Sequence, residues 1–160
     1  ARMPKPIFKE NDLINIIKEN IKLLNEIDLT IDINFEYKKE KILFNCDSEQ
    51  ISRVFFNLIK NSIESIQEKH FKNPDFAKKI DIVIINKSDY IEIIIIDNGT
   101  GFSEKNLNNI LKPYFTTKSK GSGLGLSIVN KIINDHNSRI KFVQQNIGAK
   151  IIIKFQKNVN

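Results

Sequence analysis

Two glycine clusters bound a stretch of the chain whose residues could bind a phosphorylated ligand. The clusters are Asp97-Asn98-Gly99-Thr100-Gly101 and Gly121-Ser122-Gly123-Leu124-Gly125, and they hold five of the six glycines. Glycine permits positive φ and lets the backbone come close to a ligand. The second cluster leads into a predicted helix, where unpaired N–H groups and the helix dipole attract phosphate oxygens. The pattern predicts a phosphate or nucleotide site, although a glycine triad alone is a weak signal.

Asp97 is the first polar residue after the apolar run Ile93-Ile94-Ile95-Ile96, so we expect its carboxylate at the end of a buried strand. A carboxylate that loses its water needs a hydrogen-bond donor. The exocyclic amine of a purine is one such donor. The alternative interpretation is an ordinary turn, because Asp-Asn-Gly is also a common hairpin sequence.

Asn57 and Asn61 are four residues apart, which places them on one face of a predicted helix, at the edge of its apolar stripe. Their side-chain carbonyl oxygens could hold Mg²⁺ directly or through its water ligands. The alternative is a pair of surface asparagines in a chain rich in asparagine.

Composition restricts the classes of function. The chain has 160 residues, 41% hydrophobic and 28% charged, as expected of one soluble globular domain. The net charge is +6, but the lysines are scattered, which favours a solvated basic surface over nucleic-acid or membrane binding. The single cysteine, Cys46, excludes an internal disulfide, and with two histidines it leaves no tetrahedral zinc set. The longest apolar run is too short to span a membrane.

Hydrophobic periodicity predicts the elements that would position these residues. Helices are expected from Asn11 or Asp12 to 24, from an Asp47 or Ser48 cap to 69, from 103 to 110 and from 123 to 136. Three hairpins are expected, formed by 31–37 with 42–46, 80–85 with 91–96, and 139–143 with 149–155. The fold class predicted is an α/β two-layer sandwich, with a mixed, mainly antiparallel sheet covered on one face by three helices.

Four motifs stand in a characteristic order: Asn57-x-x-x-Asn61, Asp97-x-Gly99-x-Gly101, Pro113-Tyr114-Phe115-Thr116-Thr117-Lys118 and Gly121-x-Gly123-Leu124-Gly125. In this order the chain resembles the catalytic ATP-binding domain of bacterial sensor histidine kinases, and most closely the nitrogen-regulation type. That fold is shared with gyrase, heat-shock chaperones and mismatch-repair ATPases. The resemblance covers about residues 7 to 156. It implies that residues 1–6 are a linker from an acceptor-histidine domain and that 157–160 are a tail.

The resemblance also implies ATP and Mg²⁺ as cofactors, with roles for individual residues. Asp97 resembles the aspartate that accepts the adenine amine, and Gly99 and Gly101 resemble the glycines beside the base. Asn61 resembles the Mg²⁺ ligand, assisted by Asn57. Residues 112–123 resemble a flexible lid over the triphosphate. Lys60 or Lys118 is implied as a phosphate contact, and Gly121, Gly123 and Gly125 resemble the hinge of the lid and its phosphate contacts. Leu124 is implied as a further nucleotide-binding residue.

The sequence departs from the family pattern at two positions near Asn61. Many histidine kinases carry Lys or Arg where Glu64 stands. Because Glu64 lacks that positive charge, Lys60 becomes the stronger candidate for a phosphate contact in this turn. The family's Asn-Ala pair is Asn61-Ser62 here, a small-for-small exchange that we expect to pack.

Asn57 separates two reaction types. Hydrolysing relatives carry a glutamate there, four residues before the magnesium asparagine, as the general base that activates water. An amide cannot take a proton at neutral pH, so the sequence favours phosphoryl transfer over hydrolysis.

Neither His70 nor His136 is followed by the acidic residue of the family's acceptor motif, and we expect both to be surface histidines. The resemblance therefore implies an acceptor histidine on a separate dimerisation domain of the same kinase and a response regulator downstream. It also implies a cytoplasmic domain without nucleic-acid or membrane contacts. Because the sequence starts at Ala1 without an initiator methionine, we expect an excised fragment. Histidine kinases usually dimerise through the acceptor domain, so the resemblance implies a monomer for this chain. Two alternatives stay open: a stand-alone serine protein kinase and anti-sigma factor of the same fold, and a non-catalytic nucleotide-gated binding module.

Overall fold

The computed structural model of the chain describes residues 3–102, 107, 109, 110 and 125–157. These residues form a five-stranded sheet in the order β2-β4-β5-β7-β6 and a separate two-stranded ribbon of β1 and β3. The helices are α1 (Leu13–Asn25), α2 (Ser48–Lys72) and α4 (Gly125–Asp135). The strands are β1 (Lys9–Asp12), β2 (Asp32–Glu36), β3 (Leu43–Cys46), β4 (Lys79–Asn86), β5 (Tyr90–Asp97), β6 (Arg139–Gln144) and β7 (Ala149–Gln156).

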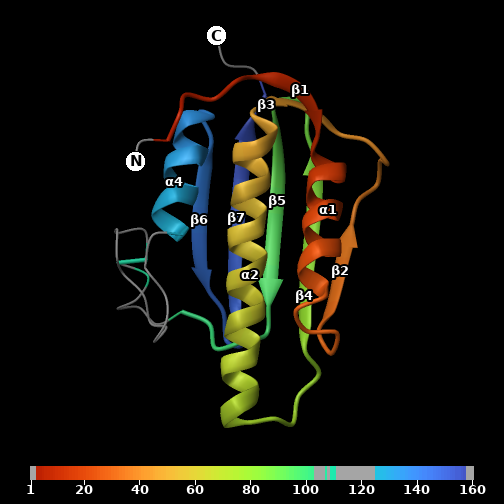
Figure 1. Cartoon of the computed structure of the whole chain (residues 1–160), viewed down its shortest axis with the longest axis vertical. Coiled ribbons are helices and arrows are strands. Elements are labelled where there is room, and N and C mark those ends of the chain that lie inside the picture. Colours follow the sequence, from red (N-terminus) through yellow and green to blue (C-terminus); the bar gives the residue numbers. More distant parts are fainter. Residues whose placement is uncertain (1–2, 103–106, 108, 111–124, 158–160) are drawn as a thin grey trace.

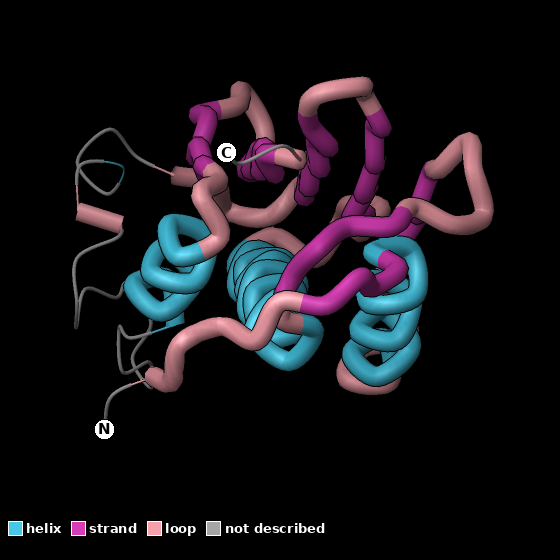
Figure 2. The backbone as a smooth tube through the Cα atoms, turned by 90° about the horizontal axis from the view of Figure 1, so that it is seen from above, coloured by secondary structure: helices cyan, strands magenta, loops and turns pink. Residues whose placement is uncertain are grey.

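The three helices lie on one face of the five-stranded sheet (Figures 1 and 2). Within the sheet, β2 runs parallel to β4 and every other pair of neighbours is antiparallel. The predicted two-layer sandwich with a mixed, mainly antiparallel sheet is therefore confirmed, as are the β4–β5 and β6–β7 hairpins.

The predicted hairpin of residues 31–37 with 42–46 is wrong. The β2 strand pairs with β4, and β3 pairs with β1. The reason is visible at the start of α1, where the Asp12 carboxylate accepts the N–H of Ile42 at 3.0 Å and Leu13 donates its N–H to the Ile42 carbonyl at 2.9 Å. These bonds hold β3 at the beginning of α1 instead of beside β2. Alternation of apolar residues sets which face of a strand is buried but does not choose its partner.

Side-chain caps start the first two helices as predicted. Asp12 accepts the N–H of Ile14 at 3.1 Å, and Asp47 accepts that of Gln50 at 3.1 Å. Such caps satisfy N–H groups that the first helical turn leaves unpaired. The second helix continues three residues beyond its predicted end, so His70 lies in its last turn and not in a loop. The predicted helix over 103–110 and the predicted start of the last helix at 123 fall largely outside the described residues.

The core lies between α2 and the inner faces of β4, β5 and β7. The central strand β5 alternates between buried and half-buried side chains and is hydrogen-bonded on both edges, as its apolar sequence predicts. Fully burying an aliphatic or aromatic side chain contributes about 1.5–3 kcal/mol. The fully buried residues facing each other here include Val54, Phe55, Leu58, Ile82, Ile93, Ile153 and Phe155. This packing fixes the end of β5, and with it Asp97, against α2.

Candidate nucleotide-binding site

Asp97 is the last residue of β5, and its side chain is only 4% exposed. Burial raises the pKa of this carboxyl, while hydrogen bonds from the Gly99 N–H, the Ser62 hydroxyl and the Ala149 N–H act in the opposite direction. The bond from Gly99 N to Asp97 Oδ1 is 2.9 Å long. The predicted buried carboxylate at a strand end is confirmed. The alternative interpretation holds in part: the Asp97–Gly99 bond forms a local turn, but this turn does not join β5 to a hairpin partner, because the neighbours of β5 are the preceding β4 and the distant β7.

The loop that follows Asp97 is attached to α2 by side chains. Ser65 Oγ accepts the Thr100 N–H at 2.9 Å, and Lys69 Nζ donates to the Asn98 carbonyl at 2.8 Å. On the other side, Asn98 Oδ1 accepts the Lys79 N–H at 3.0 Å. The loop is therefore tied both to the helix layer and to the sheet.

Both glycines of the first cluster are required by packing. A Cβ on Gly99 would lie 2.4 Å from Ser65 Oγ and 2.8 Å from the Ser65 carbonyl carbon. Gly101 has a φ of +77°, and a Cβ there would lie 2.5 Å from the Gly148 carbonyl oxygen. The close approach predicted for these glycines is present, but towards the protein's own backbone. Their predicted contact with adenine stays a prediction.

Gly148 was not among the predicted site residues. It has a φ of +77°, and a Cβ there would lie 1.8 Å from the Asp97 carbonyl oxygen. The β6–β7 turn thus packs directly on the end of β5. The only signal in the sequence is that Gly148 is the one glycine outside the two clusters.

The predicted magnesium residues lie on α2. Asn57 and Asn61 are both half-buried, and Ser62 beside Asn61 is 2% exposed and bonds Asp97. A Cβ on Gly125, the first described residue of α4, would lie 3.4 Å from Asn57 Oδ1. Helix α2 therefore places Asn57 next to Gly125. It also places Asn61 next to Ser62, which contacts Asp97.

Of the other predicted phosphate contacts, only Lys60 lies among the described residues. Lys60 is exposed, and its ammonium lies 5.7 Å from the centroid of the Phe56 ring. The predicted lid, residues 112–123, lies outside the described residues, and so do the predicted nucleotide-binding residues Lys118, Gly121, Gly123 and Leu124. Their roles stay predictions.

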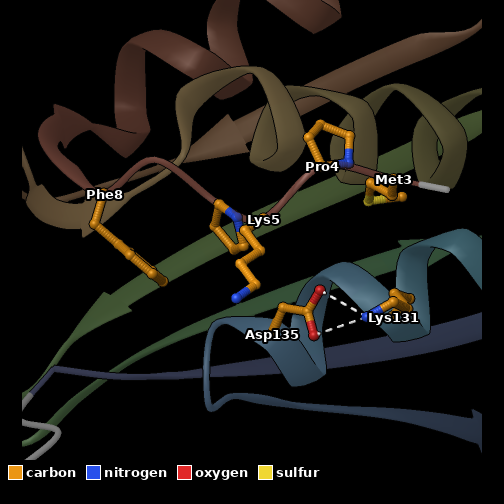
Figure 3. Close-up of a pocket in the computed structure, with 7 residues that line it drawn as sticks. Met3, Pro4, Lys5, Phe8, Lys131 and Asp135 are labelled. Atoms are coloured by element: carbon orange, nitrogen blue, oxygen red, sulfur yellow. Dashed lines mark hydrogen bonds and ion pairs between the residues drawn. The ribbon is translucent and has the colours of Figure 1, made fainter.

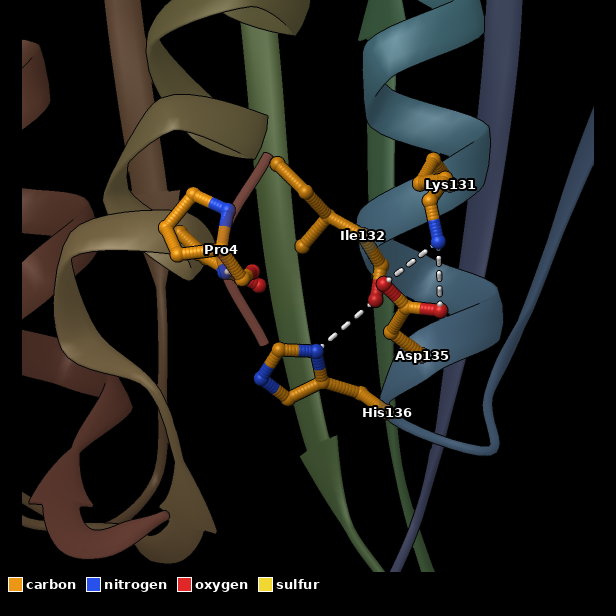
Figure 4. Close-up of polar contacts among 6 residues, drawn as sticks. Pro4, Lys131, Ile132, Asp135 and His136 are labelled. Atoms are coloured by element: carbon orange, nitrogen blue, oxygen red, sulfur yellow. Dashed lines mark hydrogen bonds and ion pairs between the residues drawn. The ribbon is translucent and has the colours of Figure 1, made fainter. Parts of the chain in front are cut away.

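His136 is 3% exposed, so its predicted place on the surface is wrong; His70 is exposed as predicted. The Nδ1 atom of His136 lies 2.7 Å from the Ile132 carbonyl oxygen (Figure 4), and Nε2 accepts the Asp47 N–H at 3.1 Å. With Nδ1–H as donor, the neutral ring satisfies both bonds. The histidine therefore joins the end of α4 to the start of α2, which single-sequence reasoning could not foresee.

The segment before β1 packs against this same junction. The Ile7 N–H bonds Asp47 Oδ2 at 2.8 Å, and Gln50 Nε2 donates to the Pro4 carbonyl at 2.9 Å. Burial alone raises the pKa of Asp47, but the N–H groups of Ile7, Gln50 and Glu49, together with His136, outweigh burial and hold that pKa below its usual value. A pocket of about 360 Å³ separates this segment from α4; Met3, Pro4, Lys5, Pro6, Phe8, Lys131 and Asp135 line it (Figure 3).

The described residues hold neither a membrane-spanning helix nor a cluster of typical metal ligands. They contain no helix both long enough and apolar enough to cross a membrane. In that same part of the chain, no three or more His, Cys, Asp or Glu residues cluster as a metal site.

Known proteins resemble this chain in sequence. The model of the family described as histidine kinase-, DNA gyrase B-, and HSP90-like ATPase matches residues 46–159. A sensor histidine kinase NtrY-like protein of Rickettsia prowazekii is 34% identical over 156 residues, which are 97% of this chain and 25% of that protein. Nitrogen regulation protein NtrY of Azorhizobium caulinodans is 33% identical over 143 residues, 88% of this chain and 18% of the relative. The chain thus spans about a quarter or less of the length of these curated relatives.

Solved structures resemble it in fold. The nucleotide-free catalytic domain of histidine kinase ThkA superposes with a TM-score of 0.81 at 30% identity, over 94% of this chain and 96% of that one. ThkA in complex with the response regulator protein TrrA gives a TM-score of 0.77 at 28% identity, over 94% of this chain and 42% of that one. The chain belongs to the histidine kinase-, DNA gyrase B- and HSP90-like ATPase family, as a catalytic domain of the histidine kinase type.

Proposed function

We propose that the chain binds ATP with Mg²⁺ and transfers the γ-phosphoryl group to a histidine on a separate dimerisation domain of the same kinase. A response regulator downstream receives the group in turn. The observation that carries the proposal is the buried Asp97 carboxylate, held at the end of β5 by α2 and by the 97–101 loop. Residues 1–6 are proposed as the linker from the acceptor domain, 7–156 as the catalytic domain and 157–160 as a tail, with the domain located in the cytoplasm.

Asp97 is suited to select adenine. It is an acceptor in a nearly water-free position, and the amino group of adenine is a donor that guanine does not offer at the same place. Leaving a buried acceptor unpaired costs about 1–3 kcal/mol, which penalises bases that cannot donate to it. Gly99 and Gly101 are proposed to keep the approach to the base clear of side chains.

Asn57 and Asn61 are proposed to hold Mg²⁺ through their amide oxygens, either directly or through its water ligands. Mg²⁺ retains several waters and commonly takes the rest of its ligands from substrate phosphates, so two amide groups suffice on the protein side. When bound, the ion offsets the charge that builds up on the phosphates during transfer. Lys60 or Lys118 is proposed as a phosphate contact, together with Gly121, Gly123 and Gly125, and Leu124 is proposed as a further nucleotide-binding residue.

The identity of residue 57 supports transfer over hydrolysis. The Asn57 amide next to Gly125 cannot accept a proton at neutral pH, so no base at this position activates water. Phosphoryl transfer depends mainly on positioning and charge stabilisation, which the other residues of the site can provide. The complex of the similar ThkA with a response regulator supports the proposed downstream partner.

Calorimetry with a non-hydrolysable ATP analogue tests the binding step. Asp97→Asn should lower the affinity by about 10- to 100-fold, because a hydrogen bond to a charged acceptor is lost and an amide N–H faces the adenine amine. Asp81→Asn makes the same chemical change on the open face of the sheet and should bind like the wild type. Equal affinities of the two variants would show that Asp97 does not contact the nucleotide. Binding that does not depend on Mg²⁺ would contradict the proposed cation site.

A transfer assay separates the proposed reaction from the two alternatives. The chain, ATP and Mg²⁺ are incubated with an acceptor domain carrying its histidine, and the product is treated with acid. An acid-labile phosphoryl group supports a histidine kinase. An acid-stable product indicates a serine kinase, and nucleotide binding without transfer indicates a binding module.

A further inference from the structure

The face of the five-stranded sheet away from the helices carries a residue pattern that the proposed function does not use. Side chains alternate along a strand, so those that do not face the helices share the opposite face. Figure 2 shows α1, α2 and α4 on the other side, so none of the described helices covers this face. Its half-buried members on β4 and β5 are Asp81, Val83, Ile85, Tyr90, Glu92, Ile94 and Ile96.

The strand register aligns this face into two rows that cross the sheet from β2 to β6. One row reads Glu36, Val83, Ile94, Ile152, Lys141, and the next reads Asn34, Asp81, Ile96, Lys150, Val143. Each row has an acidic side, a branched apolar centre and a lysine on the far side. Asn34 Nδ2 lies 3.2 Å from Asp81 Oδ1, which confirms that these two side chains share the face.

We propose that this face docks a second copy of the same chain, sheet against sheet, about a two-fold axis parallel to β5. Such a rotation exchanges β4 with β7 and β2 with β6, and it places each row opposite itself. Val83 then faces Ile152 of the second copy, and Ile94 and Ile96 face their own counterparts. The acidic side of each row meets the lysine side: Asp81 faces Lys150, and Glu36 faces Lys141.

The charges select this orientation over the other two-fold arrangement. An axis lying in the face but perpendicular to the strands would keep the acidic side of one copy over the acidic side of the other. A third row, Ile85, Glu92, Lys154, Arg139, works against the pairing, since it brings the two Glu92 carboxylates near the axis. We therefore expect Glu92→Gln to strengthen association.

The size of the face predicts a weak complex. Five strands about 4.8 Å apart, each contributing six residues with a rise of about 3.3 Å, present a face of roughly 500 Å². Specific interfaces usually bury about 800 Å² on each partner. The apolar centre supplies the attraction and the charged sides fix the orientation, so the expected Kd is on the order of 0.1 mM.

Sedimentation velocity of the domain, over concentrations that bracket this Kd, tests the proposal through charge reversal. An acidic variant carries Lys141→Glu and Lys150→Glu, and a basic variant carries Glu36→Lys and Asp81→Lys. Each alone should remain monomeric, because like charges face each other on both sides of the axis. An equimolar mixture should form a heterodimer. The two variants have net charges of +2 and +10, starting from +6 and changing by two per substitution, so overall charge attraction does not explain such pairing.

Lys22→Glu with Lys72→Glu is the matched control, because it makes the same charge change on exposed residues of the helix layer. It should associate at least as well as the wild type. Nucleotide affinity and melting temperature of all variants should stay near wild type, which shows that they are folded and separates this face from the nucleotide site. A wild type that is monomeric throughout, a dimer that persists in either charge variant, or a mixture that fails to pair overturns the proposal.

Discussion

The two ends of the long helix α2 are both fastened by side chains from distant parts of the chain, but in different ways. At its start, Asp47 accepts N–H groups from Ile7 and Gln50 and donates its own to His136. Farther along, Ser65 and Lys69 extend from the helix to hold the loop after Asp97. The first end joins structural elements to one another, whereas the second holds a loop of the candidate site. Changes at the first end should therefore alter stability alone, and changes at the second should alter stability and nucleotide binding together.

Gly148→Ala should have the largest effect on stability and on nucleotide binding. Gly148 packs on Asp97, the residue that precedes the loop held by the second end of α2. Its φ of +77° is unfavourable for alanine, and the new Cβ would overlap the Asp97 carbonyl oxygen. We expect a loss of about 2–5 kcal/mol in the free energy of unfolding, measured with urea, and weaker nucleotide binding. Gly125→Ala is the control for stability: among the described residues its Cβ would meet Asn57 alone, at 3.4 Å, so stability should change by at most about 1 kcal/mol. Equal stabilities would contradict the packing described at Gly148.

His136→Ala removes side-chain contacts at the first end of α2. It removes the bonds to Ile132 and Asp47 and the edge contact with Phe8, whose ring centroid is 5.2 Å away. The expected loss in unfolding free energy is about 2–4 kcal/mol. Nucleotide affinity should stay within about twofold of the wild type, because the hydrogen bonds of the two ends, within the described part of the chain, involve different residues. His70→Ala, in the exposed last turn of the same helix, is the control and should be nearly neutral. A large loss of affinity in His136→Ala would show that the two ends are coupled.

The contrast between these two ends also explains what the sequence could predict. The Asp12 and Asp47 caps, the β4–β5 hairpin and the buried Asp97 are determined by residues within a few positions of one another, so local patterns reveal them. The bond between Asp47 and His136 joins residues 89 positions apart, and the packing of Gly148 on Asp97 is also long-range. The parallel pairing of β2 with β4 belongs to the same class, which is why a local hairpin was wrongly expected there.

Ser65→Ala tests the second end with a smaller change. It leaves the Thr100 N–H without its acceptor at 2.9 Å and should cost about 1–2 kcal/mol in stability. Because the same loop carries Gly99 and Gly101, calorimetry should show weaker nucleotide binding as well. Ser88→Ala, in the exposed β4–β5 turn, is the control and should change neither quantity. Normal affinity in a destabilised Ser65→Ala would mean that the loop does not contribute to the site.

The smallest expected effect is a difference in pH dependence between the two carboxylates. The folded-state pKa of Asp97 is raised, chiefly by burial, above its usual 3.8. Between the unfolded-state pKa and the raised folded-state pKa, the folded state binds more protons than the unfolded state. The stability contributed by Asp97 therefore falls as pH rises through this range. The folded-state pKa of Asp47 is instead lowered despite burial, by its N–H donors, so its contribution is present above 3.8 and is lost as pH falls through the folded value.

Urea unfolding of wild type, Asp97→Asn and Asp47→Asn across the acidic range measures both effects. Asparagine is itself a good helix cap, so Asp47→Asn removes the titration while the helix start is kept. Relative to the wild type, Asp97→Asn should become more stable as pH rises, and Asp47→Asn should become less stable. If both stability differences changed with pH in the same direction, the two carboxylates would have similar environments. The contrast between a structural role for Asp47 at the start of α2 and a ligand-binding role for Asp97 would then lose its support.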